Sequence, residues 1–173
     1  MKPARAAASE DPHVARLAEL FRSHEIWSEA ARLIAADATC AVFFSHRPGE
    51  PWRLVRRGGV SVLEPGAAQD PDFAFCFAPR AIEALARTRG GIGDFALALF
   101  RLALERDPER RVRIRVIAPF GRLLRRGYVG LLLRGGPKLL RFGARHGVRS
   151  LAELRRLVDA ARRTKPEAWE RAS

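Results

Sequence analysis

The segment Asp72-Phe73-Ala74-Phe75-Cys76-Phe77 decides the fold that we expect for this chain of 173 residues. Phenylalanine occupies every second position, and successive side chains of a strand point to opposite faces, so Phe73, Phe75 and Phe77 share one face. Their row is the most apolar surface of the predicted sheet. A helix that opens at Pro79 follows directly and carries Ile82 and Leu85 on its apolar side. The sequence therefore predicts an apolar strand that packs against helices.

Four other short segments have strand character. Segment 111–117 alternates arginine with β-branched residues, which is typical of a half-buried strand whose arginines face water. Two glycine-containing pairs, Pro48-Gly49 and Gly58-Gly59, predict turns between strands that come earlier in the chain. These earlier strand segments are residues 39–45, 52–56 and 60–64. We therefore expect about five strands in one mixed or antiparallel sheet.

Helical spacing of apolar residues predicts helices around these strands. Asp11-Pro12 starts the first helix, with aspartate as the N-cap and proline at the first helical position, and a second helix is expected over 27–36. Before the fifth strand, Asp94 is expected to cap a helix over 95–104 in which Arg101 is the single polar residue. Because this helix is apolar nearly all round, it must be covered on more than one side.

Three helical segments are expected after the fifth strand. Residues 122–134 and 138–145 are basic and rich in leucine, and Gly135-Gly136-Pro137 interrupts them. Ser150 and Glu153 have the spacing of a capping box, which predicts the start of the last helix. Together, the segments predict an α+β fold in which helices cover the sheet.

Length and composition favour one folded domain. A chain of 173 residues with 47% hydrophobic residues can bury one sizeable core, and we expect a single domain over 11–163 between a flexible N-terminus, 1–10, and a flexible tail, 164–173. The apolar runs are far shorter than the roughly 18 residues that a membrane span needs, and no secretory signal pattern is recognised. Two cysteines cannot form a disulfide framework. We therefore expect a cytoplasmic protein.

The residues show no pattern that indicates catalysis or a cofactor. Gly91-x-Gly93-x-x-Ala96 matches a loose dinucleotide-binding pattern, but a predicted helix precedes it and Asp94 would repel a pyrophosphate, so we interpret it as a helix boundary. Cys40 and Cys76 are interpreted as buried structural thiols, with a nucleophile as the alternative. The histidines lack the spacing of zinc ligands. We therefore expect no catalytic residue, no metal and no cofactor.

Positive charge is concentrated in one part of the chain. Residues 111–149 contain eleven of the 32 lysines and arginines and no Asp or Glu, and the whole chain has a formal net charge of +13. Such a segment suits an anionic partner. Six of its cations stand at helical spacing beside leucines and are expected to contact an anionic membrane or a charged head group. They are Arg122, Arg125, Arg126, Lys138, Arg141 and Arg145.

The order of these elements resembles the sterol-carrier-protein family of nonspecific lipid-transfer proteins. The resemblance covers roughly residues 39–141 and rests on the phenylalanine strand, the helix from Pro79, the apolar helix over 95–104 and the arginine-rich strand. It implies a single α+β domain with a five-stranded sheet and helices that enclose an apolar cavity for a sterol, fatty acyl chain or other lipid. The family commonly has Gly-Asp after its fifth strand, where this chain has residues 118–121, Ala-Pro-Phe-Gly.

The resemblance implies a set of ligand-binding residues and a non-catalytic function. We expect the protein to bind, transfer or present a hydrophobic ligand and to lie in the cytoplasm or at the membrane periphery. A solid core built from the same side chains is the alternative. Two other functions stay open: nucleic-acid binding through residues 111–149, and a lipid-presenting subunit of a biosynthetic complex. The expected ligand-binding residues are Phe73, Phe75, Phe77, Ile82, Leu85, Phe95, Leu99 and Leu102.

Overall fold

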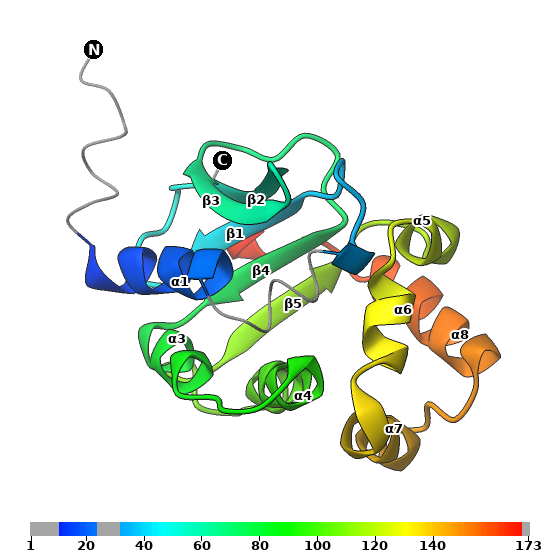
Figure 1. Ribbon diagram of the computed structural model, residues 1–173. Helices are drawn as coiled ribbons and strands as arrows, with labels where there is room; N and C mark the ends of the chain where they lie inside the picture. The colour runs from blue at the N-terminus through cyan, green and yellow to red at the C-terminus, as the bar shows by residue number, and fades with distance from the viewer. Residues whose placement is uncertain (1–10, 24–31, 171–173) are drawn as a thin grey trace.

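A five-stranded mixed sheet forms the centre of the molecule in the computed structural model, which describes residues 11–23 and 32–170 (Figure 1). The strands lie in the order β3-β2-β1-β4-β5, with β1 parallel to β4 and all other neighbours antiparallel. Their bounds are β1 Cys40–Phe44, β2 Trp52–Arg57, β3 Val60–Pro65, β4 Phe73–Phe77 and β5 Val112–Val116. The predicted α+β class with five strands in one mixed sheet is confirmed.

The turn between β2 and β3 follows from its sequence. Gly58 and Gly59 both have positive φ, 56° and 83°, so they form the two-residue hairpin connection that matches the twist of the strands. Val60 then pairs with Arg57, and the register continues to Trp52 opposite Pro65.

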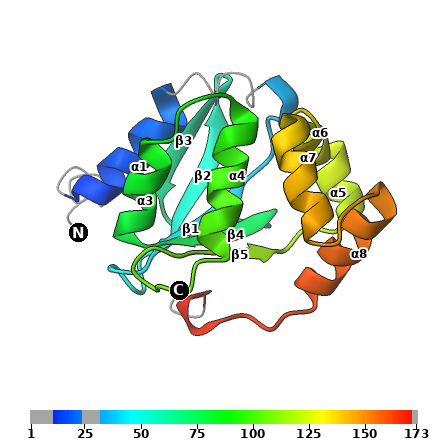
Figure 2. The same cartoon turned by 90° about the horizontal axis from the view of Figure 1, so that it is seen from below.

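Seven α-helices are described, and they form two groups (Figures 1 and 2). Helices α1, α3 and α4 cover one face of the sheet, and α5 to α8 gather beside the end of β5. Residues 27–31 of the predicted helix over 27–36 lie outside the described residues, and residues 32 and 33 are helical. The bounds of the first group are α1 Pro12–Ser23, α3 Pro79–Ala86 and α4 Ile92–Ala103. Those of the second group are α5 Phe120–Arg125, α6 Tyr128–Leu133, α7 Gly136–Arg145 and α8 Leu151–Arg162.

Several helix boundaries test the sequence signals directly. The Asp11 carboxylate accepts hydrogen bonds from the backbone N–H groups of His13 and Val14, which confirms the first N-cap. The Ser150 hydroxyl accepts from the Glu153 backbone N–H, which confirms the capping box. Asp94 is not the N-cap residue, because α4 begins about one turn earlier with Gly91 as its N-cap. Asp94 lies in the first helical turn and pairs there with Lys138 of α7.

The basic helical segment 122–134 is divided into α5 and α6 at Gly127. Gly127 has a φ of 86°, and a Cβ atom there would lie 1.8 Å from the carbonyl oxygen of Leu33. The left-handed conformation and the close backbone contact both require glycine. The chain therefore turns at this point, so that α6 does not continue the direction of α5 (Figure 1).

The main hydrophobic core lies between the sheet and helices α1, α3 and α4. Phe77 of β4, Ile82 and Leu85 of α3, and Phe95 and Leu102 of α4 are buried in one cluster. The opposite face of the sheet has a smaller cluster, in which the Trp169 ring meets Phe43 edge-on at a centroid distance of 5.4 Å. Residues 164–170, expected to belong to a flexible tail, therefore return to the sheet.

Candidate functional site

The alternating phenylalanines of β4 form a continuous aromatic row. Centroid distances are 5.8 Å from Phe73 to Phe75 and 5.9 Å from Phe75 to Phe77, which confirms that the three rings share one face. Burial differs along the row, because Phe77 is fully enclosed in the core whereas Phe73 and Phe75 are partly exposed. One end of the row is therefore sealed and the other is accessible to solvent.

The eight expected ligand-binding residues divide in the same way. Five are buried in the main core: Phe77, Ile82, Leu85, Phe95 and Leu102. The other three, Phe73, Phe75 and Leu99, are partly exposed, and Phe75 and Leu99 pack against the core cluster whereas Phe73 belongs to a neighbouring one. The structure thus joins residues from β4, α3 and α4 into one apolar region.

Two residues that the sequence reasoning did not select extend this partly exposed region. Ile114 of β5 stands directly opposite Phe75 in the sheet, and Leu131 comes from α6. Both are partly exposed and pack against the same core cluster as Phe75 and Leu99. The alternation in residues 111–117 could have identified Ile114, because it predicts that this side chain points away from the arginines.

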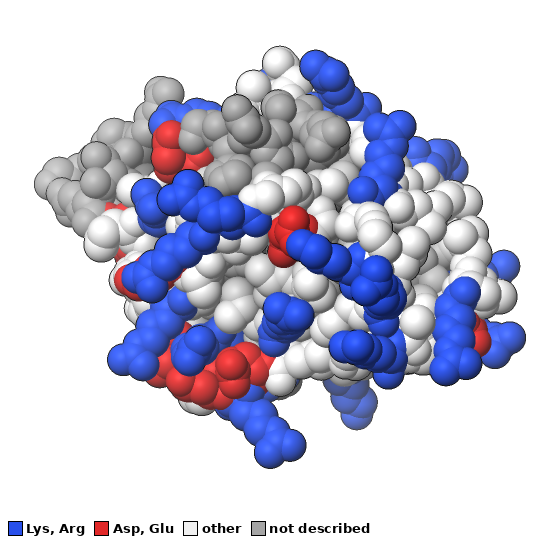
Figure 3. Space-filling model, turned by 60° about the horizontal axis from the view of Figure 1, so that its bottom comes forward, with Lys and Arg blue, Asp and Glu red and all other residues white. Residues whose placement is uncertain are grey.

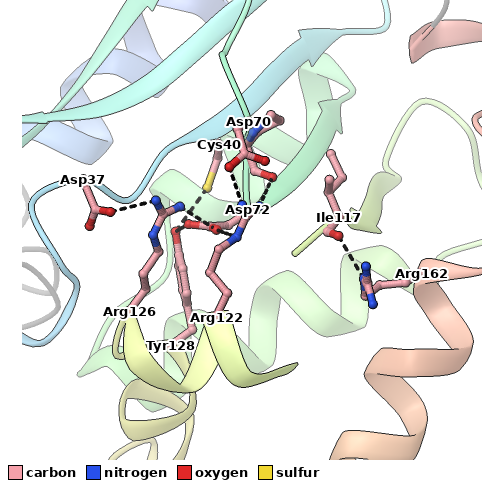
Figure 4. Close-up of polar contacts among 10 residues, drawn as sticks. Asp37, Cys40, Asp70, Asp72, Ile117, Arg122, Arg126, Tyr128 and Arg162 are labelled. Carbon is pink, nitrogen blue, oxygen red and sulfur yellow. Dashed lines mark hydrogen bonds and ion pairs between the residues drawn. The ribbon is translucent and has the colours of Figure 1, made fainter. Parts of the chain in front are cut away.

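Beyond Phe73 the apolar row ends at a buried carboxylate. Asp72 is 0% exposed, and its carboxylate accepts a hydrogen bond of 2.7 Å from Arg126 and one of 3.1 Å from the Tyr128 hydroxyl (Figure 4). The Arg122 Nε atom lies 3.0 Å from the same carboxylate. We call this group, Asp72, Arg122, Arg126 and Tyr128, the Asp72 cluster.

The backbone of Asp72 explains why a charged residue is buried at this position. Its N–H donates to the Thr39 carbonyl, and its carbonyl accepts from the N–H groups of Ile117 and Ala118. The start of β4 is therefore fixed between the segments that precede β1 and follow β5. A carboxylate held there away from water needs cationic or hydrogen-bonding partners, which α5, α6 and the turn between them supply.

Two further aspartates, both with exposed side chains, contact the same arginines. Arg126 donates a hydrogen bond of 2.7 Å to Asp37, and Arg122 donates to Asp70 and to the Pro71 carbonyl. The hydrogen bond from Arg126 holds the pKa of the Asp37 carboxyl below its ordinary value. Arg122 within α5 and Arg126 at its C-terminal end thus connect this helix to the loops that flank the sheet.

This arrangement corrects the sequence-based assignment of Arg122 and Arg126 to a membrane surface. Their side chains are only 16% and 14% exposed and point toward Asp72 (Figure 4). Arginines four residues apart lie on one side of a helical turn, so their shared direction was foreseeable, but the carboxylate that they meet was not. A possible signal was Asp70-Pro71-Asp72 directly before an apolar strand.

The other four cations of the predicted surface are exposed. Arg125, Lys138, Arg141 and Arg145 have exposed side chains, and Lys138 lies 2.9 Å from the Asp94 carboxylate. The strand arginines Arg113 and Arg115, expected to face water, are only partly exposed.

The two thiols are buried, as the sequence suggested, and lie on neighbouring strands of the sheet, Cys40 on β1 and Cys76 on β4. Burial raises the pKa of Cys40 to about 12 and that of Cys76 to about 11. Cys40 lies 3.6 Å from the Tyr128 hydroxyl, whose own pKa is raised by burial. Both thiols and the Tyr128 hydroxyl therefore stay protonated near neutral pH, which does not favour a thiolate nucleophile.

Histidine and carboxylate groups elsewhere make ordinary polar contacts. His46 lies 2.9 Å from the Asp11 carboxylate, with the His13 ring at a centroid distance of 5.4 Å. Over residues 11–23 and 32–170, no group of three or more His, Cys, Asp or Glu side chains is placed to hold a metal ion. In the same part of the chain, no helix has both the length and the apolar character needed to cross a bilayer.

Comparison with family models, curated proteins and solved structures finds no match to this chain.

Proposed function

We propose that this protein binds a hydrophobic ligand, such as a fatty acyl chain, sterol or other lipid, and transfers or presents it without catalysis. The ligand lies on the apolar region formed by Phe75, Leu99, Ile114 and Leu131. These residues come from β4, α4, β5 and α6, and all four are partly exposed while packing against one core cluster. This convergence is the observation that carries the proposal.

The difference in burial between the core and the apolar region favours a ligand site over a uniformly filled interior. Phe77, Phe95 and Leu102 next to this region are at most 8% exposed, so the core itself is closed. Large apolar side chains from four elements that stay partly in contact with water form a surface that gains from being covered. The five-stranded α+β domain also agrees with the fold that the sterol-carrier resemblance implies.

The energy available to a lipid ligand is sufficient for useful affinity. Transferring each methylene from water to an apolar surface is favourable by about 0.8 kcal/mol. About ten covered methylenes of a long acyl chain therefore contribute about 8 kcal/mol before the cost of restricting the ligand. No reacting group is needed for this function, because affinity arises from removing apolar area from water.

Native mass spectrometry of the purified protein, before and after delipidation, tests the proposal. We expect co-purified lipid in the first sample, and rebinding of a fluorescent fatty acid or sterol probe in the second. Leu99→Glu should abolish both, because it places a charge within the apolar region. The matched control is Leu104→Glu at the end of the same helix, where the leucine is already 60% exposed, and this variant should bind normally.

Two results would contradict ligand binding. One is a folded protein that carries no lipid and binds neither probe after delipidation. The other is a folded Leu99→Glu variant, verified by circular dichroism, that binds as well as the parent protein. Ile114→Trp fills the apolar region with a larger side chain and adds no charge. It should also reduce probe binding in a folded protein, which attributes the loss of binding to lost space and not to unfolding.

The nucleic-acid alternative loses part of its support from the Asp72 cluster. Two of the eleven cations in residues 111–149, Arg122 and Arg126, are committed to internal carboxylates and are mostly enclosed. The accessory-subunit alternative shares the same apolar region and differs in the protein that receives the ligand. Ligand binding is therefore the property to measure first.

A further inference from the structure

The turn between α6 and α7, with α7 itself, exposes leucine and arginine side by side. Leu133 at the end of α6 and Leu140 in α7 are each 52% exposed. Arg134 and Arg141 follow them directly in the chain and are also exposed. We call residues 133–145 the α6–α7 corner. A half-exposed leucine is common on protein surfaces, but two leucines beside exposed arginines form a surface that can bind both an apolar phase and anions.

The packing of α7 fixes which of its sides faces outward. Phe142 stacks on Phe100 of α4 at a centroid distance of 6.4 Å, and Leu139 is buried. Near the start of the helix, a Cβ on Gly93 would lie only 1.7 Å from the Gly135 carbonyl oxygen, so the two backbones touch there. With 100° per residue, Leu140 and Arg141 project away from this contact.

The cations of this corner are not neutralised within the protein. Arg134, Arg141 and Arg145 form no ion pair with any residue in the described part of the chain, whereas Lys138 is held by Asp94. Residues 111–149 contain no acidic side chain that could compensate them. On the side of the molecule that includes α7, Lys and Arg side chains stand beside uncharged surface (Figure 3).

We propose that the α6–α7 corner docks on the surface of an anionic bilayer, with Leu133 and Leu140 entering the interface and Arg134, Arg141 and Arg145 contacting lipid phosphates and carboxylates. Leucines gain free energy in the interfacial region of a bilayer but contribute little to binding a phosphate backbone, which needs cations and aromatic stacking. The combination therefore favours a membrane over a nucleic acid. This inference does not depend on ligand binding at the apolar region.

Vesicle flotation tests the docking surface with phosphatidylcholine vesicles, with or without phosphatidylserine. Each arginine near an anionic surface contributes about 1 kcal/mol, so a triple change to glutamine at Arg134, Arg141 and Arg145 should weaken binding roughly a hundredfold. The matched control makes the same change at three exposed arginines elsewhere, Arg16, Arg80 and Arg106, and lowers the net charge equally. It should retain most of the binding.

The leucines have their own pair of variants. Leu133→Ser with Leu140→Ser should weaken vesicle binding roughly tenfold, from the apolar area lost at the interface. Val60→Ser with Leu104→Ser, at positions 40% and 60% exposed outside the corner, should leave binding unchanged.

Four outcomes would overturn the proposal. These are equal binding to both kinds of vesicle, equal loss with the two arginine triples, no loss with the leucine pair, and tighter binding to duplex DNA than to phosphatidylserine vesicles at the same salt concentration. A delipidated protein that binds no probe but still floats with anionic vesicles would contradict the proposed function and leave the docking surface intact.

Discussion

Replacing Asp72 with asparagine should lower the free energy of unfolding by about 3 kcal/mol, because the two arginines that face it would lose their buried counter-charge. Asp72 is 0% exposed, and it meets Arg126 at 2.7 Å and Arg122 at 3.0 Å. Removing one member of a buried ion pair costs about 3 to 5 kcal/mol. We take the lower end because Asp37 and Asp70 still contact the arginines after the change.

Urea unfolding followed by circular dichroism measures this change, provided that the dependence on urea is the same for both proteins. For a chain of this size, 3 kcal/mol corresponds to a fall of about 6 to 12 °C in Tm. Asp70→Asn is the matched control, because Asp70 also contacts Arg122 but its side chain is 75% exposed. It should cost less than about 1 kcal/mol.

The reasoning is refuted if Asp72→Asn unfolds within about 0.5 kcal/mol of the parent protein, or if the Asp70 control is equally destabilising. Tyr128→Phe provides an independent measurement on the same carboxylate, since it removes the 3.1 Å hydrogen bond to Asp72 and retains the ring. We expect it to cost about 1 to 2 kcal/mol.

Three further predictions concern other parts of the molecule. Burial raises the pKa of Cys40 to about 12 and that of Cys76 to about 11, so neither thiol should react with Ellman's reagent at pH 8 before the protein unfolds. The stability that the protonated thiols contribute is present below their ordinary pKa of 9.0 and should be lost as the pH rises toward the raised values. Labelling of the native protein at pH 8 would contradict this prediction. Gly93→Ala should destabilise by about 2 kcal/mol because its Cβ would lie 1.7 Å from the carbonyl oxygen of Gly135, the N-cap of α7. Gly130→Ala, with open space around it, should be neutral or stabilising, and thermal melts of the two variants compare them. Trp169→Ala should lower stability by about 1 kcal/mol through loss of the aromatic contact with Phe43, and an unchanged urea midpoint would show that residues 164–170 contribute little.

Local sequence determined the elements of this fold. The alternation of phenylalanine in residues 72–77 is a property of a strand by itself, and Gly58-Gly59 specifies the hairpin because both residues adopt positive φ without a side-chain clash. Ser150 and Glu153 cap the last helix through atoms three residues apart. Such signals can be interpreted from sequence because the interacting groups are neighbours in the chain.

Only the tertiary structure decided the use of the charged and partly exposed residues. Six cations at helical spacing looked alike in the sequence, yet Arg122 and Arg126 point to a carboxylate about fifty residues away, whereas Arg141 and Arg145 face outward. Likewise, Phe73 and Phe77 occupy equivalent positions in the alternating pattern, but only Phe77 is buried beneath α3 and α4. Periodicity fixes the side of an element on which a residue lies, whereas the parallel pairing of β1 with β4 and the packing of distant helices fix what that side meets.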